Sequence, residues 1–214
     1  MDIKAFIFDM DGLLFDSERI VQRSWEIAGD ELGIPHMGDV IYHTLGMNRA
    51  GRNEYFRKYI REDFPFEEFG KLTRDNFWKI VDKEGLPLKK GAKELLAYGK
   101  SQGYKMAVAT SSSREYAMGN LIRAGIDSYF DSVVCGDMVK KAKPDPEIYQ
   151  KASESLRIPP EYCMAFEDAP GGILSAHQAG MKVIMVPDLV QPTQEIRELT
   201  HRACDCLLYT SPSP

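Results

Sequence analysis

The stretch AFIFDMDGLLFDSE (residues 5–18) begins like a buried strand and then turns abruptly to carboxylates. Four apolar residues lead into Asp9 and Asp11, and Gly12 follows directly. Charged groups that leave water must be paired or must bind metal. The stretch therefore predicts either a solvated turn or two carboxylates that share a cation.

Four further apolar runs resemble the first, and all five are continuous rather than alternating. Such runs are typical of parallel strands that are covered on both faces. The predicted strands span residues 5–8, 105–109, 132–135, 163–166 and 182–186, and helical patterns occupy 91–103, 112–125, 145–156 and 170–180. Ser112 and Glu115 have the spacing of a capping box at the start of one helix. This alternation predicts an α/β fold with a doubly wound, Rossmann-like and mainly parallel sheet.

A long helical segment interrupts the alternation between the first two predicted strands. Val21, Trp25 and Ala28 repeat at helical spacing, and residues 52–60 and 75–81 predict two further helices. The segment is too long for a crossover connection, so we expect an inserted α-helical domain. The predicted boundaries are 1–16 and 89–208 for the α/β core, 17–88 for the insertion and 209–214 for a disordered tail.

Composition and charge exclude several classes of function. The 214-residue chain has a net charge of −5, which argues against a nucleic-acid or membrane-surface binder. No apolar run approaches the length of a membrane span, no signal peptide is visible, and the four cysteines form no CxxC pair. We therefore expect a cytoplasmic protein with reduced thiols, as a monomer or a weak dimer.

Side chains suited to phosphate and metal chemistry follow four of the predicted strands. They are Asp9 and Asp11 after the first strand, Thr110 and Ser111 after the second, Lys143 after the third, and Glu167 and Asp168 after the fourth. Open α/β sheets bind ligands outside the carboxyl ends of their strands. Carboxylate oxygens suit Mg²⁺, and a lysine beside backbone N–H groups suits a phosphate. Each residue alone has an ordinary structural interpretation, but their joint occurrence in this order favours a functional site.

These motifs resemble those of the haloacid dehalogenase-like superfamily, in its β-phosphoglucomutase-like branch of phosphatases and phosphomutases with a helical cap domain. The matching elements are DMDGLLFDSE (9–18), Thr110, Lys143 before a proline, and FEDAPGG (166–172). The resemblance implies that Asp9 attacks phosphorus and becomes an aspartyl-phosphate. It implies that Asp11 protonates the leaving group and later activates water.

The resemblance also implies the remaining site residues. Thr110, the Ser111 amide and Lys143 would bind the phosphoryl group. The expected Mg²⁺ ligands are Asp9, the Asp11 carbonyl, Glu167 and Asp168. Together these residues imply a Mg²⁺-dependent phosphatase that hydrolyses a small phosphate monoester, such as a sugar phosphate or a similar metabolite.

Two other functions stay open at this point. GMNRAG (46–51) is similar to the cap loop that meets the substrate in sugar-phosphate members, with Arg49 as the candidate contact. A sugar phosphomutase of the β-phosphoglucomutase type is the first alternative, although DSERIVQRSW (16–25) lacks that enzyme's cap histidine. A non-catalytic protein that binds a phosphorylated ligand is the second, and metal-dependent turnover of a phosphate ester would exclude it.

Overall fold

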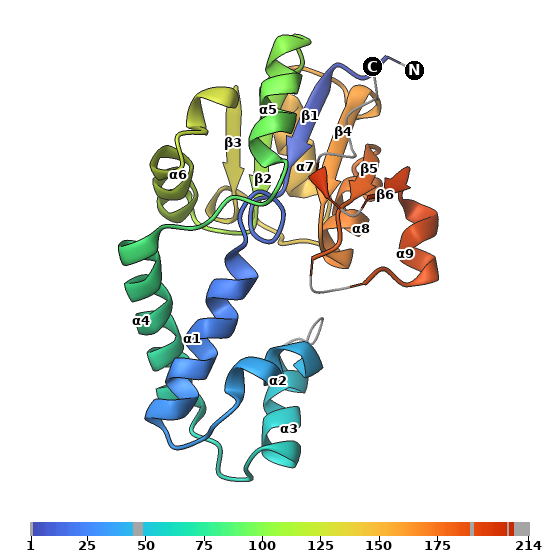
Figure 1. Ribbon diagram of the computed structural model, residues 1–214. Coiled ribbons are helices and arrows are strands. Elements are labelled where there is room, and N and C mark those ends of the chain that lie inside the picture. Colours follow the sequence, from blue (N-terminus) through green and yellow to red (C-terminus); the bar gives the residue numbers. More distant parts are fainter. Residues whose placement is uncertain (1, 45–48, 189–190, 205, 208–214) are drawn as a thin grey trace. The chain divides into compact units, whose positions relative to one another are not determined.

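The computed structural model describes residues 2–44, 49–188, 191–204 and 206–207 (Figure 1). The chain divides into two compact units. One comprises Met1–Asp16 with Pro87–Pro214, and the other comprises Ser17–Leu86. The second junction thus lies two residues before the predicted boundary at 88/89. The expectation of a disordered tail over 209–214 falls outside the described residues.

The larger unit is built on one parallel sheet, which in the described part of the chain has six strands. They are β1 (Ala5–Phe8), β2 (Lys105–Thr110), β3 (Ser132–Cys135), β4 (Cys163–Glu167), β5 (Lys182–Met185) and β6 (Arg202–Ala203). Their order is β3-β2-β1-β4-β5-β6, and every neighbouring pair is parallel. The doubly wound α/β fold is therefore confirmed, and all carboxyl ends lie at the same edge of the sheet.

Helices cover both faces of this sheet (Figure 1). The longer ones are α5 (Ala92–Ser101), α6 (Arg114–Arg123), α7 (Glu147–Leu156), α8 (Pro170–Gln178) and α9 (Gln194–Leu199). Three 3₁₀ turns, η1 (Asp127–Tyr129), η2 (Gly136–Met138) and η3 (Pro160–Tyr162), lie in the connections. The predicted helices are thus present, with ends trimmed by a few residues.

Alternate strand residues face opposite sides, as the pleat requires. Ile7 and Ala165 belong to a buried cluster that includes Tyr149 of α7 and Ile173 of α8. On the other face, the ring of Phe6 stacks on Tyr104 with centroids 4.2 Å apart, beside α5. Because apolar side chains are covered on both faces, the strands read as continuous apolar runs.

The strand β6 was not predicted. It consists of two exposed residues, Arg202 and Ala203, and is defined by their pairing with Ile184 and Met185 of β5. A strand this short carries no apolar pattern.

The smaller unit contains α1 (Ser17–Glu31), α2 (Met37–Thr44), α3 (Arg49–Tyr59) and α4 (Phe66–Glu84). Its core is aromatic: the Trp25 ring lies edge-on to Phe56 and Phe69, with centroids 5.6 Å apart in each pair. The pattern at 75–81 falls within α4, and the pattern at 52–60 overlaps α3, which ends one residue earlier, at Tyr59; both helices begin earlier than predicted. The helical content expected of the insertion is therefore present in its described residues.

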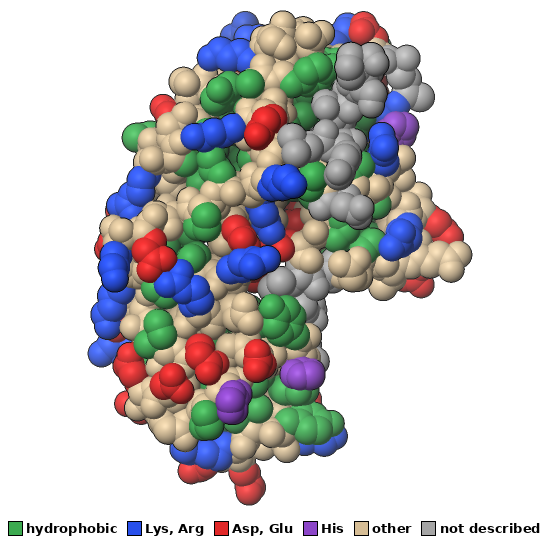
Figure 2. All heavy atoms as spheres, in the orientation of Figure 1, with side chains coloured by type: hydrophobic (Ala, Val, Ile, Leu, Met, Phe, Trp, Pro, Cys, Tyr) green, Lys and Arg blue, Asp and Glu red, His purple; other side chains and the backbone are tan. Residues whose placement is uncertain are grey.

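The surface carries mixed charge. Acidic and basic side chains are interspersed on the face that Figure 2 displays. Within the described residues, no helix combines the length and apolarity needed to cross a membrane. All four cysteines are free thiols, and three of them are buried.

Candidate active site

Asp9 stands at the carboxyl end of β1 and is 7% exposed. Its backbone N–H donates to Phe166 O at 3.0 Å, which extends the β1–β4 ladder by one residue. Gly12 then turns the chain with φ +83°, and a Cβ at this position would overlap the Asp168 carboxylate. Only glycine fits both the left-handed backbone and the close approach. The turn thereby brings two strand ends together.

Lys143 joins the ends of three strands. Its ammonium donates to Asp9 Oδ1 at 2.5 Å, to Glu167 Oε1 at 2.6 Å and to Ala109 O at 3.0 Å. Its side chain is 10% exposed. An ammonium has three donors, so these contacts use its full capacity. Lys143 is therefore fixed beside Asp9.

Glu167, the last residue of β4, is 1% exposed and engages both of its oxygens. Oε1 accepts from Lys143 and, at 2.6 Å, from the Tyr149 hydroxyl of α7. Oε2 accepts from the backbone N–H of Asp168 at 3.2 Å. A Cβ on Gly172 of α8 would overlap the Glu167 carboxylate, so this glycine leaves the room that the carboxylate occupies.

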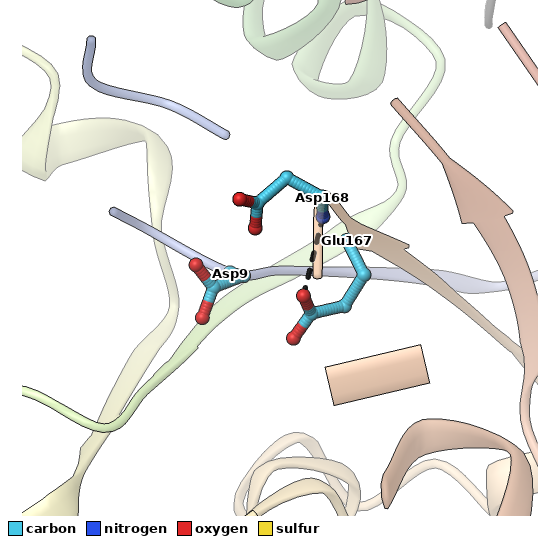
Figure 3. A group of neighbouring side chains, drawn as sticks. All are labelled: Asp9, Glu167 and Asp168. Atoms are coloured by element: carbon cyan, nitrogen blue, oxygen red, sulfur yellow. Dashed lines mark hydrogen bonds between the residues drawn. The ribbon is translucent and has the colours of Figure 1, made fainter. Parts of the chain in front are cut away.

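Asp9, Glu167 and Asp168 form a carboxylate group that could hold a metal ion. One ligand oxygen from each lies within 4.8 Å of the others. Figure 3 shows the three side chains at neighbouring strand ends, with the Asp168 N–H directed to Glu167. Hard oxygen donors of this kind suit Mg²⁺.

The charges in this group are unbalanced, because Lys143 is the cation that contacts it among the described residues. Burial raises the pKa of Asp9 to about 7, against the attraction of Lys143. Burial and the Asp9 carboxylate raise the pKa of Asp168 well above its usual value. The Lys143 pKa is also raised, since Asp9 and Glu167 outweigh the effect of burial. The site thus has a deficit of positive charge that a divalent cation would fill.

The end of β2 supplies hydroxyl and amide groups. Thr110 is 1% exposed, and its Oγ1 accepts from the Ser112 N–H at 3.1 Å. Ser111 is exposed, and its carbonyl lies so close to Gly136 that a Cβ there would clash. The loop after β2 is therefore held in place by η2 and by Thr110.

Asp11 is held by two hydroxyl groups from the segment that follows β2. Ser112 Oγ donates to Asp11 Oδ2 at 2.7 Å, and the Tyr116 hydroxyl donates to Oδ1 at 3.1 Å. The capping residue of α6 is Ser113, whose side chain accepts from the Tyr116 N–H. The predicted cap at Ser112 was therefore wrong by one residue, because the Ser112 hydroxyl is directed to Asp11.

Comparison with known proteins agrees with this geometry. A profile of the haloacid dehalogenase-like hydrolases matches residues 6–186. The chain belongs to this family. It is 34% identical to the phosphorylated carbohydrates phosphatase of Thermotoga maritima, over 85% of this chain and 84% of that protein. It is 31% identical to hexitol phosphatase A of Escherichia coli, over 87% and 84% of the two chains.

A solved structure supports the same assignment. CbbY from Rhodobacter sphaeroides, crystallised in complex with phosphate, superposes with a TM-score of 0.72 and 26% identity. The match covers 96% of this chain and 95% of that one. The family is thus matched along nearly the whole chain.

The structure of this family member brings together seven of the eight residues singled out from the sequence. They are Asp9, Asp11, Thr110, Ser111, Lys143, Glu167 and Asp168, all at the carboxyl edge of the sheet. The eighth, Arg49, is the first residue of α3, and its side chain lies outside the described residues, as does the loop 45–48.

Tyr149 and Tyr116 were missed. Tyr149 lies on the buried stripe of α7 and reads as a core residue in the sequence. Tyr116 lies in the first turn of α6, where it gives no catalytic signal. The one sequence feature that could have indicated them is that each tyrosine lies in the first turn of a helix after a predicted strand.

Proposed function

We propose that this protein is a Mg²⁺-dependent phosphatase that hydrolyses a small phosphate monoester, with sugar and polyol phosphates as the candidate substrates. One observation carries the proposal: Lys143 is bound between Asp9 and Glu167 at the strand ends, with the Asp168 carboxylate beside them. The names of the two phosphatase relatives support the substrate class.

Asp9 is the proposed nucleophile. One of its carboxylate oxygens attacks phosphorus, the bond from phosphorus to the leaving oxygen breaks, and an aspartyl-phosphate forms. Lys143 donates a hydrogen bond to Asp9 and so orients its carboxylate. Its positive charge also reduces the repulsion between the carboxylate and a phosphate dianion.

Asp11 is the proposed acid and base. It gives a proton to the leaving oxygen in the first step and takes a proton from the attacking water in the second, which releases inorganic phosphate. The side chain is half-buried at the same strand end as Asp9. With two carboxylates at one strand end, Asp9 can attack phosphorus while Asp11 transfers the protons.

Thr110 and Ser111 are the proposed phosphate contacts. The loop that carries them is fixed by hydrogen bonds, so its donors are arranged before a phosphoryl group arrives. Donors that need no rearrangement stabilise a developing charge most effectively.

The proposed metal ligands are Asp9, Asp168 and the Asp11 carbonyl. Glu167 belongs to the same carboxylate group, but both of its oxygens already accept from protein donors. We therefore assign Glu167 mainly to fixing Lys143. A bound Mg²⁺ would supply positive charge between the phosphate and the carboxylates.

Selection of the substrate is assigned to the helical unit. We propose that Arg49 binds the part of the substrate that does not react. Binding to a remote group is lost only for substrates that carry it. Replacing Arg49 by Ala should therefore raise KM for a sugar phosphate more than for a small aryl phosphate.

The test is release of inorganic phosphate from a panel of sugar, polyol and nucleoside phosphates, with Mg²⁺ and with a chelator. Asp9→Asn is the control for a contaminating phosphatase. Activity that needs both Mg²⁺ and Asp9 supports the proposal. Conversion of a sugar phosphate to its isomer without phosphate release would favour the mutase, and binding without turnover would favour a non-catalytic protein.

A further inference from the structure

The carboxylate of Asp11 accepts a hydroxyl hydrogen bond on each oxygen. The Tyr116 hydroxyl donates to Oδ1 at 3.1 Å, and Ser112 Oγ donates to Oδ2 at 2.7 Å. An acid that must deliver a proton to a leaving oxygen needs one oxygen free to face it. Each oxygen keeps a second lone-pair site, so either bond can remain, and opening one of them clears that oxygen to face the leaving group.

The two hydroxyls differ in how firmly they are placed. The Tyr116 ring is half-buried in the first turn of α6, a helix that Ser113 caps through the Tyr116 N–H. A tyrosine hydroxyl is carried by a rigid ring with two side-chain torsions. The Ser112 hydroxyl turns about a single torsion and can leave Asp11 without moving the backbone. The N–H and C=O of Ser112 are themselves bonded to Thr110 Oγ1 and Gly136 N.

We propose that Tyr116 is the positioning residue for Asp11, holding Oδ1 throughout the cycle while Ser112 releases Oδ2 to face the substrate. The inference rests on the phosphatase activity proposed above. A hydroxyl both donates and accepts, so Tyr116 can stay bonded to Asp11 whether the carboxyl is ionised or protonated. Phenylalanine cannot do so, although it fills nearly the same space.

The leaving group of the substrate separates this role from a purely structural one. An alkyl phosphate has a poor leaving group and depends on the acid. p-Nitrophenolate departs from p-nitrophenyl phosphate without a proton, so attack by Asp9 on this ester hardly needs Asp11. General acid catalysis contributes roughly 10²–10⁴-fold, and a misplaced acid loses part of that.

The experiment compares kcat/KM for hexitol phosphate and p-nitrophenyl phosphate, with saturating Mg²⁺, in the full-length enzyme. Tyr116→Phe should lower kcat/KM for the alkyl ester about 10-fold and for the aryl ester less than about 2-fold. Ser112→Ala should lower the alkyl value less than Tyr116→Phe does. Ser113→Ala is the matched control, because it weakens the cap of α6 by about 1 kcal/mol and removes neither of the hydroxyls that bond Asp11.

A second readout uses the aryl ester alone. When the water-activating base is misplaced, kcat and KM should fall together, and acid quenching should trap more phosphorylated Asp9. Adding Tyr116→Phe to Asp11→Asn should cause no further loss on the alkyl ester, because the residue to be positioned has lost its function.

Three results overturn the inference. They are equal losses on the two esters, a Ser113→Ala effect as large as that of Tyr116→Phe, and further loss in the Asp11→Asn background. A wild-type enzyme that hydrolyses neither ester refutes the proposed function and this inference together. An active wild type with an unaffected Tyr116→Phe variant refutes the inference alone.

Discussion

The ammonium of Lys143 lies 2.5 Å from Asp9 Oδ1, although 134 residues separate the two along the chain. The same ammonium bonds Glu167, so one buried cation offsets two buried carboxylates. Asp168 adds a third carboxylate to the group. The stability of the α/β unit and the chemistry of its candidate site therefore depend on the same few charged side chains.

Replacing Lys143 by Met should reduce both activity and stability. Asp9, the proposed nucleophile, would lose the cation that orients it, and kcat/KM should fall by about 10²–10³-fold, as when a pre-arranged donor is removed from other sites. Without Mg²⁺ the free energy of unfolding at pH 8 should fall by about 3 kcal/mol, because buried carboxylates lose their cation. Mg²⁺ should restore part of that stability.

Lys141→Met is the matched control for this variant. Lys141 lies in the same loop, but its side chain is 72% exposed and pairs with Asp145. Exposed ion pairs contribute about 0–1 kcal/mol. The free energy of unfolding of Lys141→Met should therefore change by no more than about 1 kcal/mol, and its kcat/KM should stay close to that of wild type. Urea unfolding with and without Mg²⁺ measures the stabilities. Equal effects of the two substitutions would contradict the proposed role of Lys143.

Asp9→Asn and Asp11→Asn should have different kinetic signatures. Loss of the proposed nucleophile should lower the rate by more than about 10⁴-fold for every ester, with no phosphorylated intermediate. Loss of the acid and base should cost roughly 10²–10⁴-fold on alkyl esters. It should leave a phosphorylated Asp9 that mass spectrometry detects after acid quenching of the aryl ester. Wild-type rates in Asp9→Asn would rule out the mechanism.

Gly171 and Gly172, adjacent in α8, should respond oppositely to alanine. A Cβ at Gly172 would overlap the Glu167 carboxylate, whereas a Cβ at Gly171 meets no neighbouring heavy atom within 4 Å. Gly172→Ala should therefore destabilise the protein by about 1–3 kcal/mol and lower activity through the displaced Glu167. Gly171→Ala should stabilise it by up to about 1 kcal/mol, because alanine favours the helix. Calorimetry and kcat/KM of the two variants decide the point.

The sequence predicted the frame of the site because three of the buried apolar strands, β1, β2 and β4, lead directly into polar residues of the site. Asp9 and Glu167 could be placed at one edge before any contact was known, since parallel strands share their direction. The contact that joins them through Lys143 could not be placed in the same way. It depends on how a loop folds over the sheet edge, and that loop has no periodic pattern.

The residues that support the site were harder to foresee. Tyr149 satisfies the helical pattern of α7 as a core residue would, and its hydroxyl bond to Glu167 leaves no trace in that pattern. Ser112 and Ser113 are adjacent serines, and the sequence did not decide which one caps α6. The structure gives the cap to Ser113 and the Asp11 contact to Ser112.

Asp131 provides a test of pH dependence away from the site. Its carboxylate accepts from Lys105 Nζ at 2.7 Å and from the Met106 N–H at 2.9 Å, which links the starts of β2 and β3. Although burial opposes ionisation, the hydrogen bonds from Lys105 and Met106 outweigh it and lower the pKa of Asp131 below its usual value. A carboxylate with a lowered folded-state pKa stabilises the fold at neutral pH, and that stabilisation is lost as the pH falls through the folded-state pKa.

Asp131→Asn should therefore lower the free energy of unfolding by about 1 kcal/mol at pH 7, the usual contribution of such hydrogen bonds for a side chain about one-third exposed. The difference from wild type should shrink as the pH falls below about 4, because the wild-type carboxylate then takes up a proton as well. Asp127→Asn, at an exposed position in η1, is the matched control. Urea unfolding of the three proteins between pH 3 and pH 7 measures the effect. A destabilisation by Asp131→Asn that stayed constant with pH would mean that the charge of Asp131 contributes nothing.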